Sequence, residues 1–381
     1  LNPILIATTV RRVDMPDPLW NHAAPIKNPW DKRVKIDMPT PPDTLTTFLR
    51  QPLSLRGREI PGRLFLAPLS KLGNTAFREI IAGYGGYGLL FSEMCWARSV
   101  PCGNGHDQGG FMWRTDENLQ ELVCQIFGND PDAMARAATI IEAEGFFGVD
   151  INFGCSVAAV CKKQCGAALL RVPEKAATIV AAIRKAVDIP VFVKFRTGWE
   201  DRPEAAVDMA RRFEAAGADA LTFHPRVAPD RRTRPPKWAY IADVKSAVGI
   251  PVFGNGDVFD RADCERMVQT TGCDGVVLGR LALAKPWIFG EWAGTFTPTP
   301  DIYHTCARRL SYLLERYYHP ATARRRFMRY AAYFSANFQF GHTLYSHLHR
   351  TQDMDAIRDA LDRFFDISPE LLQRPNMNRF R

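Results

Sequence analysis

The chain has 381 residues, of which 46% are hydrophobic and 24% charged, and its formal net charge is +8. This length suits one large domain with a smaller one, and the composition is ordinary for a globular protein. No apolar run approaches the ~18 residues that a membrane helix needs, and the first residues lack the basic lead and cleavage site of a secretion signal. We therefore expect a cytoplasmic protein without a membrane partner, and the positive charge favours a polyanionic one.

Residues 1–60 are rich in proline, which forbids long helices and central strands. This segment is predicted to be an irregular N-terminal arm, attached to the body of the protein by aromatic side chains such as Trp20 and Trp30. Its last part, residues 53–62, has the pattern of a short hairpin that leads into the first core strand.

Short apolar runs alternate with amphipathic stretches between residues 61 and 298. The runs predict eight strands, at residues 64–67, 88–92, 123–127, 148–152, 190–194, 220–223, 251–254 and 275–278. The stretches predict helices at residues 74–82, 131–144, 173–187, 203–216, 238–248 and 261–270. Apolar strands alternating with helices indicate a buried parallel sheet, and eight units favour an α/β fold of the (β/α)8 TIM-barrel type. A doubly wound sheet is the alternative, but no GxGxxG follows the first strand.

Residues 299–381 have a different composition and are predicted to form a small helical bundle. Its three expected helices are residues 303–318, 322–340 and 353–365. In the middle one, apolar residues recur at helical spacing and form one stripe, made of Phe327, Ala331, Phe334 and Phe338.

The stretch VDINFGCSVAAVCKKQCG, residues 149–166, places a cysteine on a loop after the fourth predicted strand. A thiol in this position, Cys155, is placed to react rather than to pack. The nine cysteines are an odd number without even spacing, which argues against a disulfide framework. A metal cluster with Cys161 and Cys165 is an alternative, although the spacing matches no usual zinc or iron–sulfur pattern.

Polar or conformationally special residues also close the other predicted strands, where barrel enzymes carry their chemistry. Several of these strand ends match motifs of one family in the same order along the chain: LAPLSKLGNTAFR, SEM, QIFGNDP, DINFGC, GAALLRVPE, VFVKFRTGW, LTFHPR, VFGNGDV and GVVLGRLALAKPWIF. Over about residues 60–290, the chain resembles the tRNA-dihydrouridine synthases. The resemblance implies an enzyme that binds FMN and reduces the 5,6-double bond of uridine in tRNA, with NADPH as electron donor.

The resemblance also implies a cofactor site. Lys194 would compensate negative charge at N1 of the flavin. The phosphate would lie on backbone amides after the seventh and eighth strands, with an arginine beside it. Gln125 and His224 would hydrogen-bond the isoalloxazine edge or the phosphate, although His224 alone could equally be structural. The full set of expected cofactor residues is Pro68, Leu69, Gln125, Lys194, His224, Asn255, Gly256, Gly279 and Arg280.

For the substrate, the resemblance implies that Cys155 is the general acid that protonates C5 of uracil, because an unperturbed thiol with a pKa of about 8.5 carries its proton at neutral pH. Asn152 could recognise the uracil edge, since an amide offers both a donor and an acceptor. Arg226 is a candidate for binding the RNA backbone or the base.

Residues 301–381 carry 13 arginines, no lysine and 8 acidic residues, which is +5 of the chain's +8. Arg325 and Arg329, one helical turn apart, would share the edge opposite the apolar stripe and bind tRNA phosphates. Two other functions stay open: an FMN-dependent reductase of a free small molecule such as a pyrimidine, and an RNA-binding barrel without catalysis. We expect a monomer.

Overall fold

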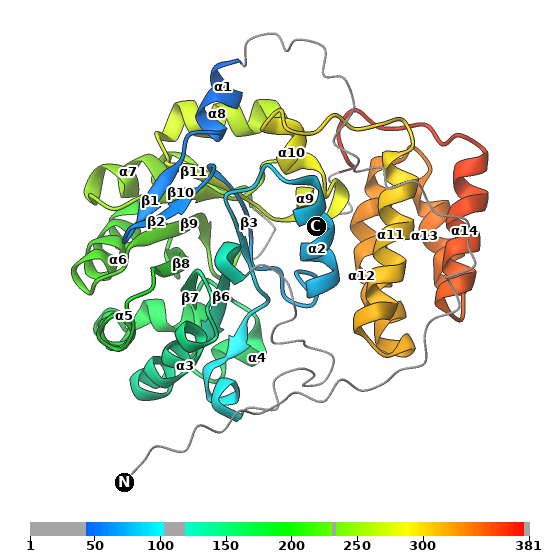
Figure 1. Cartoon of the computed structure of the whole chain (residues 1–381). Helices are drawn as coiled ribbons and strands as arrows, with labels where there is room; N and C mark the ends of the chain where they lie inside the picture. The colour runs from blue at the N-terminus through cyan, green and yellow to red at the C-terminus, as the bar shows by residue number, and fades with distance from the viewer. Residues whose placement is uncertain (1–42, 103–118, 231–233, 377–381) are drawn as a thin grey trace. The chain divides into compact units, whose positions relative to one another are not determined.

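The computed structural model describes residues 43–102, 119–230 and 234–376. In this part of the chain eight parallel strands close into a barrel, because each pairs with the next and β4 also pairs with β6 (Figure 1). The predicted TIM barrel is therefore confirmed. Its strands are β3 (Leu64–Leu66), β4 (Leu89–Phe91), β6 (Leu122–Phe127), β7 (Gly148–Phe153), β8 (Val191–Gly198), β9 (Ala220–Val227), β10 (Val252–Asn255) and β11 (Gly275–Leu278).

The predicted barrel helices are also present, and they cover the outside of the strands (Figure 1). Local sequence explains where several of them begin. Asp130 accepts hydrogen bonds from the first-turn amides of α3, and α3, α5 and α6 each have proline in the first turn, where no amide hydrogen is needed. The helices are α2 (Thr75–Tyr84), α3 (Pro131–Ala143), α5 (Pro173–Ala186), α6 (Pro203–Ala215), α7 (Ala239–Ala247), α8 (Arg261–Thr271), α9 (Arg280–Ala284) and α10 (Ile288–Trp292).

Alternate residues of each strand point into the barrel, and near its N-terminal end they form a separate apolar cluster that includes Phe65, Phe91, Phe192 and Phe253. The predicted hairpin, β1 (Leu53–Leu55) and β2 (Arg58–Ile60), packs Leu55 and Ile60 against this cluster. Arg58 also donates to the carbonyl oxygens of Phe146 and Phe147, both at 3.1 Å, just before β7 begins. The hairpin thus covers the N-terminal end of the barrel, and the functional end is the opposite one.

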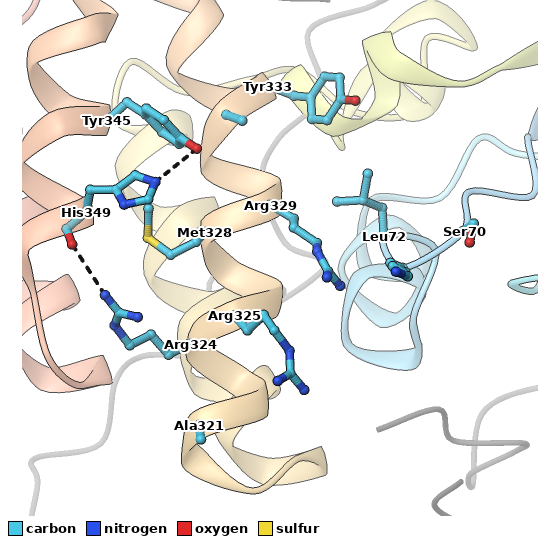
Figure 2. Close-up of a pocket in the computed structure, with 12 residues that line it drawn as sticks. Ser70, Leu72, Ala321, Arg324, Arg325, Met328, Arg329, Tyr333, Tyr345 and His349 are labelled. Carbon is cyan, nitrogen blue, oxygen red and sulfur yellow. Dashed lines mark hydrogen bonds between the residues drawn. The ribbon is translucent and has the colours of Figure 1, made fainter. Parts of the chain in front are cut away.

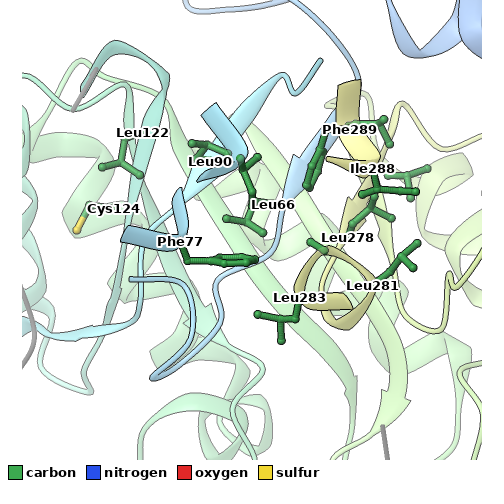
Figure 3. Packing of buried hydrophobic residues seen from close by; sticks show 14 of the residues in the cluster. Leu66, Phe77, Leu90, Leu122, Cys124, Leu278, Leu281, Leu283, Ile288 and Phe289 are labelled. Carbon is green, nitrogen blue, oxygen red and sulfur yellow. The ribbon is translucent and has the colours of Figure 1, made fainter. Parts of the chain in front are cut away.

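The outward-pointing residues of the same strands form the main core with the surrounding helices. Figure 3 shows part of this layer, where Leu66, Leu90 and Leu278 of the strands lie beside Phe77 of α2 and Leu281 of α9. All five side chains are at most 5% exposed. The barrel is therefore packed on both sides of its sheet, as the near-continuous apolar strands predicted.

One helix lies inside the segment that was predicted to be irregular. Helix α1 (Thr44–Leu49) is capped by Asp43, whose side chain accepts from the amide of Thr46 at 2.7 Å, and it buries Leu45 and Leu49. Only six residues long, it fits between prolines that exclude longer helices. The rest of the predicted arm, residues 1–42, lies outside the described residues.

The C-terminal region is helical, but the prediction of three helices was wrong. Among the described residues it contains α11 (Ile302–Tyr317), α12 (Pro320–Phe334), a short 3-10 turn (Ser335–Asn337), α13 (Gly341–Arg350) and α14 (Met354–Asp366). The apolar stripe is buried as predicted, since its four members are at most 2% exposed. The stripe continues past the end of α12, however, so the periodicity did not reveal that the chain turns there.

Two contacts explain this turn. The side-chain amide of Asn337 donates to the carbonyl oxygens of Phe334 and of Ala284 in the barrel, both at 2.8 Å, so it satisfies the end of α12 and attaches it to α9. At Gly341 the chain passes so close to the carbonyl of Ser335 that a Cβ atom would lie 1.7 Å from its oxygen.

A buried ion pair joins the bundle to the barrel. Glu93, which follows β4, lies 3.2 Å from Arg326 of α12, and the two side chains are only 6% and 7% exposed. Burial raises the pKa of Glu93, while Arg326 opposes this shift. No described helix is long and apolar enough to cross a membrane.

We predict that Arg326→Met lowers the free energy of unfolding by about 3 kcal/mol at neutral pH, because it removes Arg326, which together with Arg78 stabilises the buried carboxylate of Glu93. Without Arg326 the folded-state pKa of Glu93 rises further above its unfolded value. The folded protein then binds more protons than the unfolded chain, so stability falls as pH rises between those two values.

Urea unfolding of this variant at pH 5 and pH 7.5 measures the effect. The loss of unfolding free energy relative to wild type should be larger at pH 7.5 than at pH 5. Combining Glu93→Gln with Arg326→Met should recover part of that loss. An equal deficit at both values would mean that Glu93 does not need this partner.

Candidate active site

Alternate residues of each strand point into the barrel. Toward the C-terminal end of the strands these inward-pointing residues are polar, and they lie above the apolar cluster. Strand pairing brings them side by side, since Gln125 is the Cα partner of Asp150, Asn152 of Lys194, and Arg196 of His224. The strands therefore place one layer of polar side chains directly above an apolar layer.

Hydrogen bonds connect three of these residues in a row. Gln125 Nε2 donates to Asp150 Oδ2 at 2.6 Å, and Asn152 Nδ2 donates to Gln125 Oε1 at 2.8 Å. Asn152 Oδ1 then accepts from the backbone amides of Gly154 at 3.1 Å and Cys155 at 2.9 Å. Both lone pairs of this oxygen are used. Asn152 was expected to offer a base both a donor and an acceptor, and only its N–H donor remains available.

Cys155 lies on the loop that follows β7 and is partly exposed. Besides the bond from its amide to Asn152, its carbonyl oxygen accepts from the amide of Ala167 at 2.9 Å. Gly166 makes this close approach possible, because its φ is +61° and a Cβ atom would lie 2.6 Å from the same oxygen. Both sides of the cysteine backbone are thus fixed while the thiol stays accessible.

The other two cysteines of this loop do not form a site with Cys155. Cys161 Sγ donates to the carbonyl oxygen of Cys155 at 3.6 Å, and Cys165 is buried with its thiol donating to the carbonyl of Lys163. In the described part of the chain, no group of three or more His, Cys, Asp or Glu side chains could hold a metal ion.

Cations gather beside the thiol. Burial and the neighbouring Arg196 lower the pKa of Lys194, while Asp150 opposes this shift. Burial and Arg226 lower the pKa of Arg196 to about 10. His224 has a pKa well below its usual value because it is buried beside these cations, so it is neutral at pH 7. Concentrated positive charge with lowered pKa values favours an anionic ligand.

The loops after β10 and β11 carry the residues expected to hold a phosphate. Asp257 has a left-handed φ of +51° and binds two arginines, with Arg226 Nη2 at 2.8 Å from one oxygen and Arg280 Nη2 at 2.5 Å from the other. Gly256 has a φ of +121°, and a Cβ atom there would lie 2.7 Å from the His224 ring. The backbone at this position therefore requires glycine.

Two other expected cofactor residues lie close to this pair of loops. Asn255 Oδ1 accepts from Lys194 Nζ at 3.0 Å, and its amide nitrogen donates to the carbonyl of Val277 at 2.8 Å. Leu69, partly exposed next to Pro68 after β3, lies beside Gly279, since a Cβ on that glycine would be 3.7 Å from Leu69 Cδ2. The structure thus brings the expected cofactor residues to one end of the barrel, and their role stays a prediction.

The open C-terminal end of the barrel is called the barrel mouth below. Arg226 lies inside it, where its side chain is 3% exposed and paired with Asp257. Arg325 and Arg329 lie instead on the bundle. They line a groove of about 750 Å³ between α12, α13 and the loop after β3 (Figure 2). The expected substrate residues therefore fall into two places, one in the mouth and one in the groove.

Positive and aromatic side chains line this groove. Figure 2 shows Arg325 and Arg329 extending from α12 toward the barrel loop, with Tyr345 and His349 on the other side of the helix. No Asp or Glu is among the described residues that line it, which are Ser70, Lys71, Leu72, Ala321, Arg324, Arg325, Met328, Arg329, Ala332, Tyr333, Tyr345 and His349.

The arginines of the groove differ in how they are used. Arg324 donates to the carbonyl oxygen of Thr351, at 2.7 and 3.0 Å, and so joins α12 to the end of α13. Arg325 bonds only Thr322 within its own helix, and Arg329 has no hydrogen bond or ion pair among the described residues. The two predicted arginines are therefore the ones available to a ligand.

Sequence reasoning assigned no role to three residues of the barrel mouth, Asp150, Arg196 and Asp257, although the last two stand at predicted strand ends. A signal for the first two was present, since each lies two positions along its strand from an expected site residue and so must point the same way. Asp257 gave no such signal, because its two arginine partners are 31 and 23 residues away in sequence.

Comparisons with known proteins show the family to which the chain belongs. The family model of dihydrouridine synthase (Dus) matches residues 65–366. A Mycobacterium tuberculosis protein named "Probable tRNA-dihydrouridine synthase" is 36% identical over 323 residues, which cover 80% of this chain and 82% of that protein. The tRNA-dihydrouridine synthase B of Pseudomonas aeruginosa is 32% identical over 313 residues, covering 80% of this chain and 93% of that one.

Among solved structures, 2-naphthoyl-CoA reductase in complex with 2-naphthoyl-CoA matches with a TM-score of 0.51 and 16% identity, over 68% of this chain and 53% of that one. This likeness concerns the fold alone. The family match extends from the first barrel strand to the last helix of the bundle, and the relatives match over most of their length. The chain therefore belongs to the dihydrouridine synthase family.

Proposed function

We propose that this chain is an FMN-dependent tRNA-dihydrouridine synthase that reduces the 5,6-double bond of uridine with electrons from NADPH, as a cytoplasmic monomer. The observation that carries the proposal is the placement of an accessible thiol, Cys155, beside the buried cations Lys194 and Arg196 at the open end of the barrel. A thiol can donate a proton, and the cations can stabilise an anionic cofactor.

The residues of the mouth fit FMN. His224 Nε2 and Arg196 Nη1 are buried polar atoms without a hydrogen-bond partner among the described residues, as expected where a ligand supplies the partner. Gln125 keeps one N–H and one lone pair for the edge of the ring system. The loops at Gly256 and Gly279, with Arg280, would hold the phosphate, and Pro68 and Leu69 would lie against the ring.

Bound FMN would supply the hydride that is added to C6 of uracil. Lys194 would compensate negative charge on the ring system through its buried ammonium group. Asn255 holds that ammonium at 3.0 Å and is itself fixed to β11, so the charge is positioned before any ligand arrives.

Cys155 would complete the reduction by donating the proton on its sulfur to C5 of uracil. The C4 carbonyl of the base stabilises the negative charge that develops at C5, which makes that carbon the proton acceptor. The Cys155 amide donates to Asn152 and the Cys155 carbonyl accepts from Ala167, which fixes the loop, so the thiol is presented from one side of the mouth. Asn152 would donate to the base, and Arg226 would contact the base or the RNA backbone.

The groove of the bundle would bind the body of the tRNA while the mouth takes the uridine. Supporting this, Arg325 and Arg329 are directed into a groove without acidic residues among its described lining. A planar guanidinium binds phosphate oxygens with two hydrogen bonds, which favours arginine for this role. The uridine would have to leave its base stack to reach the mouth.

The direct test is incubation of the purified protein with an unmodified tRNA transcript and NADPH, followed by mass spectrometry of the nucleosides. We expect dihydrouridine, with a mass gain of two hydrogens, and no product from free uridine or uracil under the same conditions. Reduction of the free pyrimidine with no reaction on tRNA would favour a small-molecule reductase instead.

We predict that the purified protein is yellow and releases FMN rather than FAD on denaturation, because we expect one phosphate site after β10 and β11 and the sequence carries no second nucleotide fingerprint. Arg280→Ala should weaken FMN retention without unfolding the protein, as measured by flavin absorbance per protein after gel filtration. Arg136→Ala, on the exposed face of α3, is the matched control. A colourless protein that FMN cannot reconstitute would refute the cofactor.

For Cys155→Ala we predict normal flavin content and normal flavin reduction by NADPH, with uridine reduction slower by at least ~100-fold, the usual scale for a lost general acid. Cys161→Ala and Cys165→Ala should turn over at nearly the wild-type rate. Stopped-flow absorbance separates the two half-reactions. Wild-type turnover of Cys155→Ala would show that its thiol is structural.

Changing both Arg325 and Arg329 to Gln should weaken tRNA binding and flatten its salt dependence by a slope of about 0.7–0.9 per lost phosphate contact. NADPH-driven flavin reduction should not change. A double change of Arg211 and Arg363 to Gln removes the same charge from exposed positions outside the groove and controls for net charge. If tRNA affinity and its salt slope in the Arg325/Arg329 variant equal those of the wild type, the RNA binds elsewhere on the protein.

A further inference from the structure

We infer that Asp150 is a positioning residue, which fixes the orientation of Gln125 and Asn152 and thereby the loop that carries Cys155. Asp150 is completely buried in β7 and does not reach the thiol through its own hydrogen bonds. The inference rests on the proposed function only because that function makes Cys155 the proton donor.

The direction of every hydrogen bond in this row follows from the carboxylate. An ionised Asp150 can only accept, so Gln125 must turn its NH2 group toward it, at 2.6 Å. This leaves the Gln125 oxygen for Asn152, which must then turn its own NH2 group toward Gln125, at 2.8 Å. The Asn152 oxygen is consequently left facing the loop.

The loop needs an acceptor at this point. The amides of Gly154 and Cys155 both point at Asn152 Oδ1, at 3.1 and 2.9 Å. If Asn152 turned over, its NH2 group would face two N–H donors, and both buried bonds would be lost. The carboxylate at one end of the row and the two loop amides at the other thus require the same orientation of both amide side chains, and only that orientation fixes the loop.

Two neighbours favour the accepting form of Asp150 against the effect of burial. Burial raises the pKa of the carboxyl to about 7, and the Gln125 hydrogen bond and the charge of Lys194 oppose that rise, so Asp150 is mainly in its accepting form above pH 7. Lys194 lies on the neighbouring strand as the Cα partner of Asn152. Asp150 thus interacts both with the charge of Lys194 and, through Gln125 and Asn152, with the loop that carries Cys155.

Asp150→Leu removes the acceptor at similar size, whereas Asp150→Asn keeps an oxygen that can accept from Gln125. In the flavin-loaded protein, deuterium exchange at the amides of Gly154 and Cys155 should become about tenfold faster in Asp150→Leu, as for loss of a net hydrogen bond. Asp150→Asn should stay close to wild type. Thr222→Val, another buried change inside the barrel on β9, is the matched control.

Kinetics should show the same pattern. In Asp150→Leu we expect kcat for uridine reduction about tenfold lower with KM for tRNA unchanged, and recovery in Asp150→Asn. General destabilisation would instead speed exchange along β8 (Val191–Gly198) as well. If Asp150→Leu does not fold, Gln125→Met interrupts the same row, and the exchange readout does not depend on a flavin contact of Gln125.

Wild-type exchange at Gly154 and Cys155 in whichever of these two variants folds would overturn the inference. The proposed function would fail separately, if Cys155→Ala retained full turnover, and the exchange result would stand in that case.

Discussion

Closure of the eight-stranded barrel is the constraint on which the rest of this structure depends. Once β4 pairs with β6, every strand must direct alternate residues into a shared interior. At the N-terminal end these residues are large and apolar, and the β1–β2 hairpin covers them. At the other end the same alternation continues with polar residues, and the pairing of β6, β7 and β8 brings together Gln125, Asp150 and Lys194, which are far apart in sequence.

Buried charge in the mouth is compensated in two ways. Asp257 compensates part of the charge of two arginines near the loops after β10 and β11, with one carboxylate oxygen for each of Arg226 and Arg280. Farther inside, Asp150 is the acid beside Lys194, and Arg196 keeps a buried nitrogen without a hydrogen-bond partner among the described residues. Since burying unpaired charge is costly, this region favours an anionic ligand.

The Glu93–Arg326 ion pair attaches the bundle to the barrel, and it fixes the position of the groove relative to the barrel mouth. Arg326 points inward to Glu93 after β4, while Arg325 and Arg329 of the same helix point into the groove. The loop after β3 also serves both places, because Leu69 lies beside Gly279 and Lys71 lines the groove. An RNA contacting the groove would therefore meet the catalytic end of the barrel in a defined orientation.

The sequence by itself determined much of the local pattern: the barrel strands and the helices between them, the apolar stripe of α12, and a cysteine on a loop after the fourth barrel strand. Periodicity reports which face of an element is buried, and it does so reliably when the element is long. It did not show where α12 ends, because Phe338 continues the stripe past the turn fixed by Asn337 and Gly341, and it gave no sign of α13. Only the tertiary structure decided which side chains meet, such as Gln125 with Asp150 or Asp257 with its two arginines, because strand register and barrel closure set those partners and neither is written in local sequence.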